Sequence, residues 1–157
     1  MFIRYYLDLA IPFEDVESAL LTQPDAWVPG LALAADDHGE RLLVEVGFAV
    51  DDEHRVDKQV QVEFGEPYRI PNKAALPMSW EATGRDRLFP ALDADLEVAA
   101  LGPNRTQLSI SARYRPPMGP LGRALDKALL HRVAEATVKD FLDRVGEALQ
   151  ARAVATG

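Results

Sequence analysis

The sequence contains no cysteine. This absence excludes disulfide bonds, thiolate metal sites and cysteine nucleophiles, and it favours a cytoplasmic location. No apolar run approaches the roughly 18 residues that a membrane-spanning helix needs. The first residues, MFIRYYLDLAIPFED, carry no basic leader. We therefore predict neither a transmembrane segment nor an export signal.

Basic residues are scarce as well. Lys and Arg number 17 against 25 Asp and Glu, which gives a net charge of −8. Proteins that bind nucleic acid depend on Lys and Arg to neutralise phosphates, so we predict no nucleic-acid partner. The GxSxG, phosphate-loop and HExxH motifs are also missing, and the sequence therefore indicates no hydrolase, nucleotide or zinc-protease chemistry and no cofactor.

Histidine is rare too, with three residues in the chain. His38 and His54 stand in the acidic stretches DDHGE and DDEH, which we predict to be surface hairpin turns. Their spacing matches no metal-ligand pattern, so we predict no metal site. His131 falls within a long helical pattern, where a surface or packing role is expected.

What the chain does have is the profile of a globular protein. Its 157 residues are 48% hydrophobic and 27% charged. This length suffices for one hydrophobic core, and no linker or repeat interrupts it. We predict a single domain over residues 1–157.

Apolar and polar residues alternate with period two in seven segments, which predicts seven strands. Six of these are consecutive and joined by short turns, so they are expected to form one antiparallel sheet with a dry and a wet face. The predicted strands cover residues 2–11, 31–35, 42–50, 56–64, 76–81, 92–98 and 105–114.

Helices are predicted at both ends of the strand series. Pro12 begins a short helix with an acidic first turn, and Pro24 begins a second that Pro29 and Gly30 end. After the Pro/Gly-rich segment 116–122, a long helix runs from Pro120 to Gln150, about 45 Å at 1.5 Å per residue. Because a dry sheet face must be covered, this helix is expected to lie across the concave face of the sheet.

The long helix has two apolar stripes that do not share a face. Leu121, Leu125, Leu129, Val133 and Ala136 form the first, and Val138, Phe141, Leu142, Val145 and Leu149 form the second. Either the helix bends near residues 134–137, or its halves contact different elements. We favour the second interpretation, in which the later stripe packs on the sheet. The earlier leucines would then face the short helices, the mouth of a cavity or a second subunit.

The order strand, two short helices, six strands and long helix resembles the START-like superfamily, also called helix-grip or polyketide-cyclase-like (SRPBCC). Local features carry the resemblance too, and it covers nearly the whole chain. They are Trp80, Phe89–Pro90, Thr106–Gln107–Leu108, Tyr114, Pro116–Pro117, Gly119, Leu121–Gly122 and Asp126. The resemblance implies an α+β fold, in which a seven-stranded curved antiparallel sheet wraps around the C-terminal helix. It also implies a hydrophobic cavity for lipids, sterols or polyketides, and it supplies no shared catalytic residues.

The inner faces of the predicted strands and helix give a candidate ligand site, which is apolar with few polar groups. Tyr5 and Tyr114 are its best polar anchors, because each offers a hydroxyl on a dry face. The same residues also suit a simple hydrophobic core. The candidate ligand-binding residues are Tyr5, Val46, Phe48, Val62, Phe64, Met78, Trp80, Leu96, Leu108, Ile110, Tyr114, Leu125 and Leu129.

Three functions fit this pattern. The leading hypothesis is binding or carriage of a hydrophobic small molecule, without catalytic residues. A second is a polyketide cyclase or dehydratase, for which Tyr5, Tyr114 and His131 are the candidate acid–base groups. A third is a protein–protein interaction module, in which Leu121, Leu125 and Leu129 form a homodimer contact.

Overall fold

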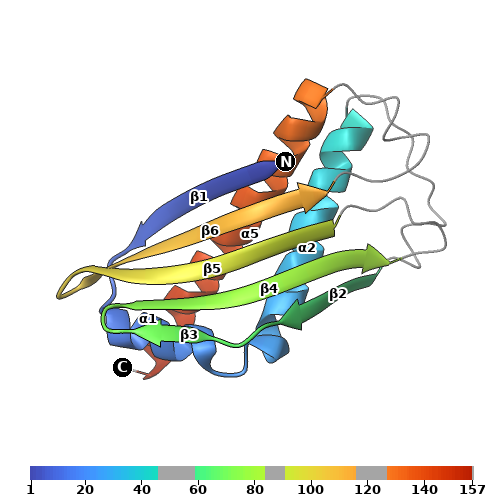
Figure 1. The fold of residues 1–157 in the computed structure, drawn as a ribbon. Coiled ribbons are helices and arrows are strands. Elements are labelled where there is room, and N and C mark those ends of the chain that lie inside the picture. Colours follow the sequence, from blue (N-terminus) through green and yellow to red (C-terminus); the bar gives the residue numbers. More distant parts are fainter. Residues whose placement is uncertain (46–58, 84–90, 116–126, 157) are drawn as a thin grey trace.

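The structure is a computed structural model that describes residues 1–45, 59–83, 91–115 and 127–156. It is an α+β fold in which an open antiparallel sheet packs on helices (Figure 1). In chain order the elements are β1 (Phe2–Leu9), α1 (Phe13–Leu21), α2 (Pro24–Glu45), β2 (Gln59–Phe64), β3 (Tyr68–Ile70), β4 (Lys73–Thr83), β5 (Ala91–Gly102), β6 (Arg105–Arg115) and α5 (Lys127–Thr156).

The sheet is curved and has six strands within the described residues, in the order β1-β6-β5-β4-β2, with β3 also paired to β4. Every pairing is antiparallel. Helices α2 and α5 lie side by side against one face, which we call the inner face, and α1 crosses below them (Figure 1). The long C-terminal helix therefore covers the sheet as predicted, but it shares that task with α2.

Five of the predicted strands are present as β1, β2, β4, β5 and β6. In each, the apolar residues of the alternating pattern point to the inner face. β5 and β6 are the clearest cases, since Leu92, Leu96, Leu108 and Ile110 are almost fully buried while Asp93 is exposed. The short strand β3 was not predicted. Residues 56–58 of the fourth predicted strand lie outside the described part of the chain.

The predictions for residues 24–45 were wrong. We expected a very short helix ending at Pro29 and Gly30, then strands at 31–35 and 42–50, whereas residues 24–45 form the single helix α2. Residues 46–50 lie outside the described residues. Buried positions recur at helical spacing along α2, and they are Val28, Ala32, Ala35, Asp36 and Gly39.

The helix tolerates Pro29 for a physical reason. Pro29 is near the start of α2, where its missing N–H removes one intrahelical hydrogen bond and leaves the later turns intact. The following alanines have the highest helix propensity of any residue. The acidic DDHGE stretch is consequently helical rather than a hairpin turn, and His38 is a half-buried residue of α2.

Gly39 marks a close approach of the two long helices. A Cβ atom added at this position would lie 2.2 Å from the Thr137 Oγ1 atom of α5. The Thr137 hydroxyl is held in place because it donates a hydrogen bond to the Val133 carbonyl at 2.8 Å. Only glycine therefore lets α2 and α5 pack this closely.

Within the described residues α5 presents one continuous buried stripe, which joins Val133 of the first predicted stripe to the residues of the second. The prediction of two separate stripes was wrong for these residues. The stripe continues toward the helix start through Leu130, Val133, Ala134 and Thr137, ahead of the predicted Val138. Ala134 and Thr137 were not recognised because they are small or polar, yet both are buried, and Thr137 lies against Gly39 of α2. Leu129, which we placed on a separate stripe, is half-buried, and Leu121 and Leu125 lie outside the described residues.

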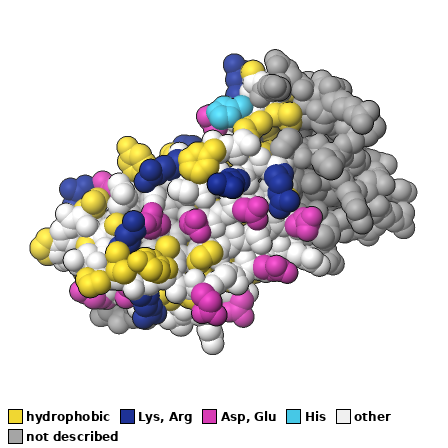
Figure 2. Space-filling view, viewed as in Figure 1, with side chains coloured by type: hydrophobic (Ala, Val, Ile, Leu, Met, Phe, Trp, Pro, Cys, Tyr) yellow, Lys and Arg dark blue, Asp and Glu magenta, His cyan; other side chains and the backbone are white. Residues whose placement is uncertain are grey.

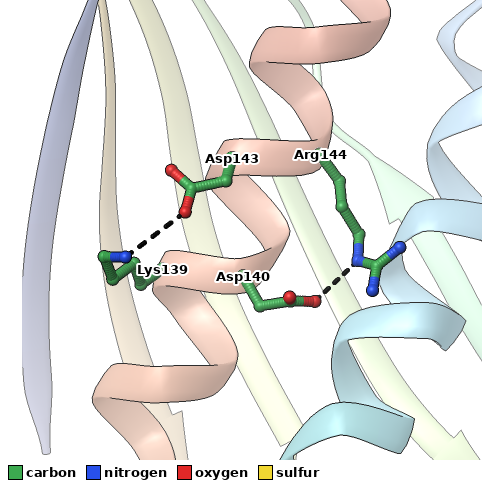
Figure 3. A network of polar contacts seen from close by, with 4 residues as sticks. All are labelled: Lys139, Asp140, Asp143 and Arg144. Carbon is green, nitrogen blue, oxygen red and sulfur yellow. Dashed lines mark hydrogen bonds and ion pairs between the residues drawn. The ribbon is translucent and has the colours of Figure 1, made fainter.

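The opposite side of α5 is polar. Lys139 pairs with Asp143 at 3.5 Å, and Arg144 pairs with Asp140 at 2.7 Å, each one turn apart (Figure 3). Such i,i+4 pairs add a few tenths of a kcal/mol to a helix. These charged residues stand on the side of α5 that turns away from the buried stripe.

The outer face of the sheet carries mixed charge. Acidic and basic side chains are interspersed over it (Figure 2), and cross-strand pairs such as Arg105–Asp8 at 2.8 Å bridge neighbouring strands. Exposed pairs of this kind contribute under about 1 kcal/mol. Within the described residues, no helix combines the length and apolar character needed to cross a membrane.

Candidate functional site

The strand registers arrange the inner-face residues in rows across the sheet. One row comes from the end of the sheet where β4 and β6 finish, and it consists of Tyr114, Leu92, Trp80 and Val62. The next row consists of Ile3, Ala112, Ala94, Met78 and Phe64. The described residues that the sequence predicted for the ligand site on strands therefore share one surface.

The centre of this surface is tightly covered. Leu96, Leu108 and Ile110 have no exposed area. A side chain with no exposed area borders no space large enough for water, so these three pack as hydrophobic core. Their contact with a ligand stays a prediction.

Trp80 fills the space between the sheet and helix α5. Its ring meets that of Phe141 from α5, with centroids 4.8 Å apart and planes at 73°, an edge-to-face contact. Met78, one position along the inner face in the next row, is also buried. Both residues were predicted for the ligand site, and the structure confirms only that they face inward.

The inner-face residues of both edge strands, β1 and β2, reach solvent. Val62 and Phe64 are half-buried, and β2 is in contact with α2. Beside them in the second row, Ala94 and Ala112 have side chains of a single methyl group. Sequence reasoning missed these alanines, although small residues on an otherwise bulky face are the signal that could have marked them.

The clearest polar feature of this interior joins the sheet to α2. Tyr114 is 3% exposed and Asp36 is 4% exposed. Burial, and secondarily the negative charge of Asp36, raise the pKa of the Tyr114 hydroxyl far above its usual value. Tyr114 is therefore neutral at physiological pH. Asp36 was missed because the sequence placed it in a surface turn.

The other predicted polar residues lie elsewhere. Tyr5 is half-buried on the first strand, and the Lys139 ammonium group stands 5.8 Å from its ring centroid. His131 is exposed on α5 and contacts Glu135 at 2.7 Å. The candidate ligand residues Val46, Phe48 and Leu125, together with His54, lie outside the described residues. In the part of the chain that the structure describes, no three His, Asp or Glu side chains gather as metal ligands do.

Comparison with known proteins gives structural likeness only. No protein-family model and no curated protein matches the chain. A conserved protein from Geobacillus kaustophilus is similar in structure, with 15% identity, 96% coverage of both chains and a TM-score of 0.55.

Weaker likenesses include Ara h 8.0201, with 10% identity over 96% of this chain and 98% of that one, at a TM-score of 0.48. The Zhui aromatase/cyclase from Streptomyces sp. R1128 has 13% identity over 92% and 93%, at 0.34. We draw no argument from these two. The likeness to the Geobacillus protein extends over nearly the whole of both chains and shows a shared fold. The observed order of elements, an open antiparallel sheet with a long C-terminal helix packed on it, agrees with the fold that the sequence resemblance implies.

Proposed function

We propose that the protein binds or carries a hydrophobic small molecule between the inner face of the sheet and helices α2 and α5. The observation that carries the proposal is the apolar inner face that reaches solvent at β2. Val62 and Phe64 are half-buried there, and the rows behind them continue the apolar surface to Trp80 and Met78. Ligand sites of this kind are concave and mostly apolar, with few polar groups.

The ligand would carry one polar group. Tyr114 belongs to the same row as Trp80 and Val62, and its hydroxyl is the polar tip of an otherwise apolar row. Since Tyr114 stays neutral, it would donate a hydrogen bond to a ligand hydroxyl or carbonyl rather than remove a proton. This chemistry supports binding over acid–base catalysis. The strand registers support this choice of ligand-binding residues, because they place Tyr114, Trp80 and Val62 in one row.

The proposal is tested with an uncharged apolar dye such as Nile red. The Val62→Glu variant places a carboxylate on the inner face, and the Gln61→Glu variant places the same group on the outer face of the same strand. We expect Val62→Glu to weaken dye binding at least tenfold, because burying an unpaired charge is strongly unfavourable. Gln61→Glu should bind as the wild type does.

A second variant guards against simple unfolding. Val62→Phe adds apolar volume without charge, and it should weaken binding while circular dichroism shows the native fold. Native mass spectrometry and solvent extraction of gently purified protein would then identify any co-purified apolar compound. If neither dye nor any apolar compound binds, or if the Val62 and Gln61 variants behave alike, the proposal is wrong.

A further inference from the structure

The first strand leaves one edge of the sheet open. β1 pairs with β6 on one side, and no described strand lies beyond it on the other (Figure 1). The strand has 8 residues, and two of its aromatic side chains, Phe2 and Tyr6, are 62% and 63% exposed. An exposed edge of this length is a template for a further strand, because its outward backbone groups have no partner in the sheet.

The hydrogen bonds to β6 show which backbone groups face this edge. The Tyr114 N–H donates to the Met1 carbonyl at 2.8 Å, so these two residues form a hydrogen-bonded pair. Hydrogen-bonded and non-hydrogen-bonded pairs alternate along an antiparallel ladder. The register of β1 on β6 therefore turns the N–H and C=O groups of every second residue of β1 toward the open edge. These residues are Phe2, Arg4, Tyr6 and Asp8, and their side chains are exposed.

Two of these residues are charged and stand symmetrically about Tyr6. Arg4 precedes Tyr6 by two positions, and Asp8 follows it by two. Charges on an edge strand ordinarily discourage pairing with other chains. In a second copy of β1 laid antiparallel, with the two Tyr6 residues opposite each other, each Arg4 lies opposite Asp8 of the other chain. Opposite charges in facing positions stabilise a strand pair, so the edge suits a second copy of itself.

Both charged groups are available for this contact. Arg4 is exposed and makes no ion pair within the described residues. Asp8 already pairs with Arg105 of β6, but that contact engages its Oδ2 atom, at 2.8 Å, and leaves the other oxygen. A carboxylate has about four acceptor positions, which is enough for two guanidinium groups.

The charge pattern selects one register among those that the outward backbone groups allow. Sliding the second copy by two residues places Arg4 or Asp8 opposite Tyr6, and sliding it by four places Arg4 opposite Arg4 or Asp8 opposite Asp8. Only the register centred on Tyr6 sets opposite charges face to face. The same register brings the half-buried Tyr5 and Leu7 opposite each other on the inner side of the strand.

We propose that two copies of the protein associate through β1, in an antiparallel pair centred on Tyr6, and so join their sheets into one. About six backbone hydrogen bonds and two Arg4–Asp8 pairs would hold the contact. Interfaces this small are weak, so we expect a dissociation constant on the order of 10 μM. The proposal does not depend on ligand binding at the inner face, and either can fail alone.

Exchanging charges between the two copies tests the contact. Arg4→Asp sets carboxylates against carboxylates, and Asp8→Arg sets guanidinium groups against guanidinium groups. Each variant alone should self-associate at least tenfold more weakly than the wild type. An equimolar mixture of the two variants restores every opposite-charge pair, so the mixture should associate about as tightly as the wild type. Sedimentation velocity measures the association, and circular dichroism checks that each variant is folded.

A control and a second readout locate the contact. Arg69→Asp is the matched control, because Arg69 is exposed on β3, away from β1, and its replacement changes the net charge as Arg4→Asp does. This variant should associate as the wild type does. In hydrogen exchange, the Arg4 and Tyr6 amides should become protected as the protein is concentrated, whereas the Tyr5 amide, which points to β6, is protected throughout.

Three results would each refute the proposal. The first is a wild-type protein that stays monomeric at ten times the expected dissociation constant. The second is self-association that Arg4→Asp retains in full, because the contact would then lie at the β2 edge or on α5. The third is a mixture of Arg4→Asp and Asp8→Arg that associates no better than either variant alone.

Discussion

The close approach of α2 and α5 at Gly39 gives the sharpest test of the fold. In the Gly39→Ala variant the new Cβ would meet Thr137 Oγ1 at 2.2 Å, a distance that requires the helices to move apart. The Thr137 side chain cannot easily turn away, because its hydroxyl is bonded to the Val133 carbonyl at 2.8 Å. We therefore expect Gly39→Ala to destabilise the protein.

Two opposing effects set the magnitude. Replacing glycine by alanine within a helix stabilises it by about 1 kcal/mol, and overpacking a filled interface costs about 1–3 kcal/mol. The net loss in the free energy of unfolding should be about 0–2 kcal/mol. When Thr137→Ala is also present, the nearest remaining atoms are the residue 137 Cβ at 3.5 Å and Val133 Cγ1 at 3.7 Å, which are ordinary contacts. In that background Gly39→Ala should stabilise the protein by up to about 1 kcal/mol.

A double-mutant cycle measured by urea denaturation checks this reasoning. The expected coupling between positions 39 and 137 is about 1–3 kcal/mol. Thr137→Ser is the control, because it keeps the Oγ atom and should not rescue Gly39→Ala. Additive effects of Gly39→Ala and Thr137→Ala would show that α2 and α5 do not meet there. They would also revive the strand interpretation of residues 31–50.

Two further predictions concern the inner face. Trp80→Ala should lower the free energy of unfolding by about 3–5 kcal/mol, because it empties the space against Phe141. Trp80→Phe should cost clearly less in urea denaturation, and equal losses would contradict this packing. Tyr114→Phe tests the raised pKa of the Tyr114 hydroxyl. Above about pH 10 the unfolded chain loses this proton while the folded state keeps it. The free energy of unfolding of the wild type therefore falls by up to about 1.4 kcal/mol per pH unit. The Tyr114→Phe variant should not show this fall. If the free energies of unfolding of the two proteins depend on pH in the same way above about pH 10, Tyr114 is not buried as described.

The sequence was a good guide where a strand faces the core on one side and water on the other. β6 is the clearest example, because Leu108, Ile110 and Tyr114 alternate with Gln107 and Arg113 at a period that only a strand satisfies. The candidate residues on these strands were placed on the correct face for the same reason.

Helix α2 was misread because its pattern fits two periods. Leu31 and Leu33 alternate with alanines, which reads as a strand, while Val28, Ala32 and Ala35 lie on one helical face. Pro29 and Gly30 added a false stop signal. The close contact of Gly39 with Thr137 favours the helix over the strand. It is a tertiary contact, which the hydrophobic pattern of one segment cannot reveal.

The same contact explains what was missed on α5 and in the site. Thr137 is buried where α5 meets Gly39 of α2, and a hydrophobicity pattern for α5 alone does not count a threonine as apolar, so it split the stripe in two. Asp36 enters the interior only once residues 24–45 are helical. Errors on one helix therefore carried over to the other helix and to the polar part of the site.

The pairing of β1 with β6 constrains how the chain reaches this structure. Phe2 lies opposite Arg113, so among the described residues β1 pairs with a strand about 110 residues later in the chain. Until that neighbour is available, β1 has no ladder to join, and closing so long a loop carries an entropic cost. Folding of this protein should consequently be slow for its size, and the apolar side of β1 stays exposed to water until β6 has formed.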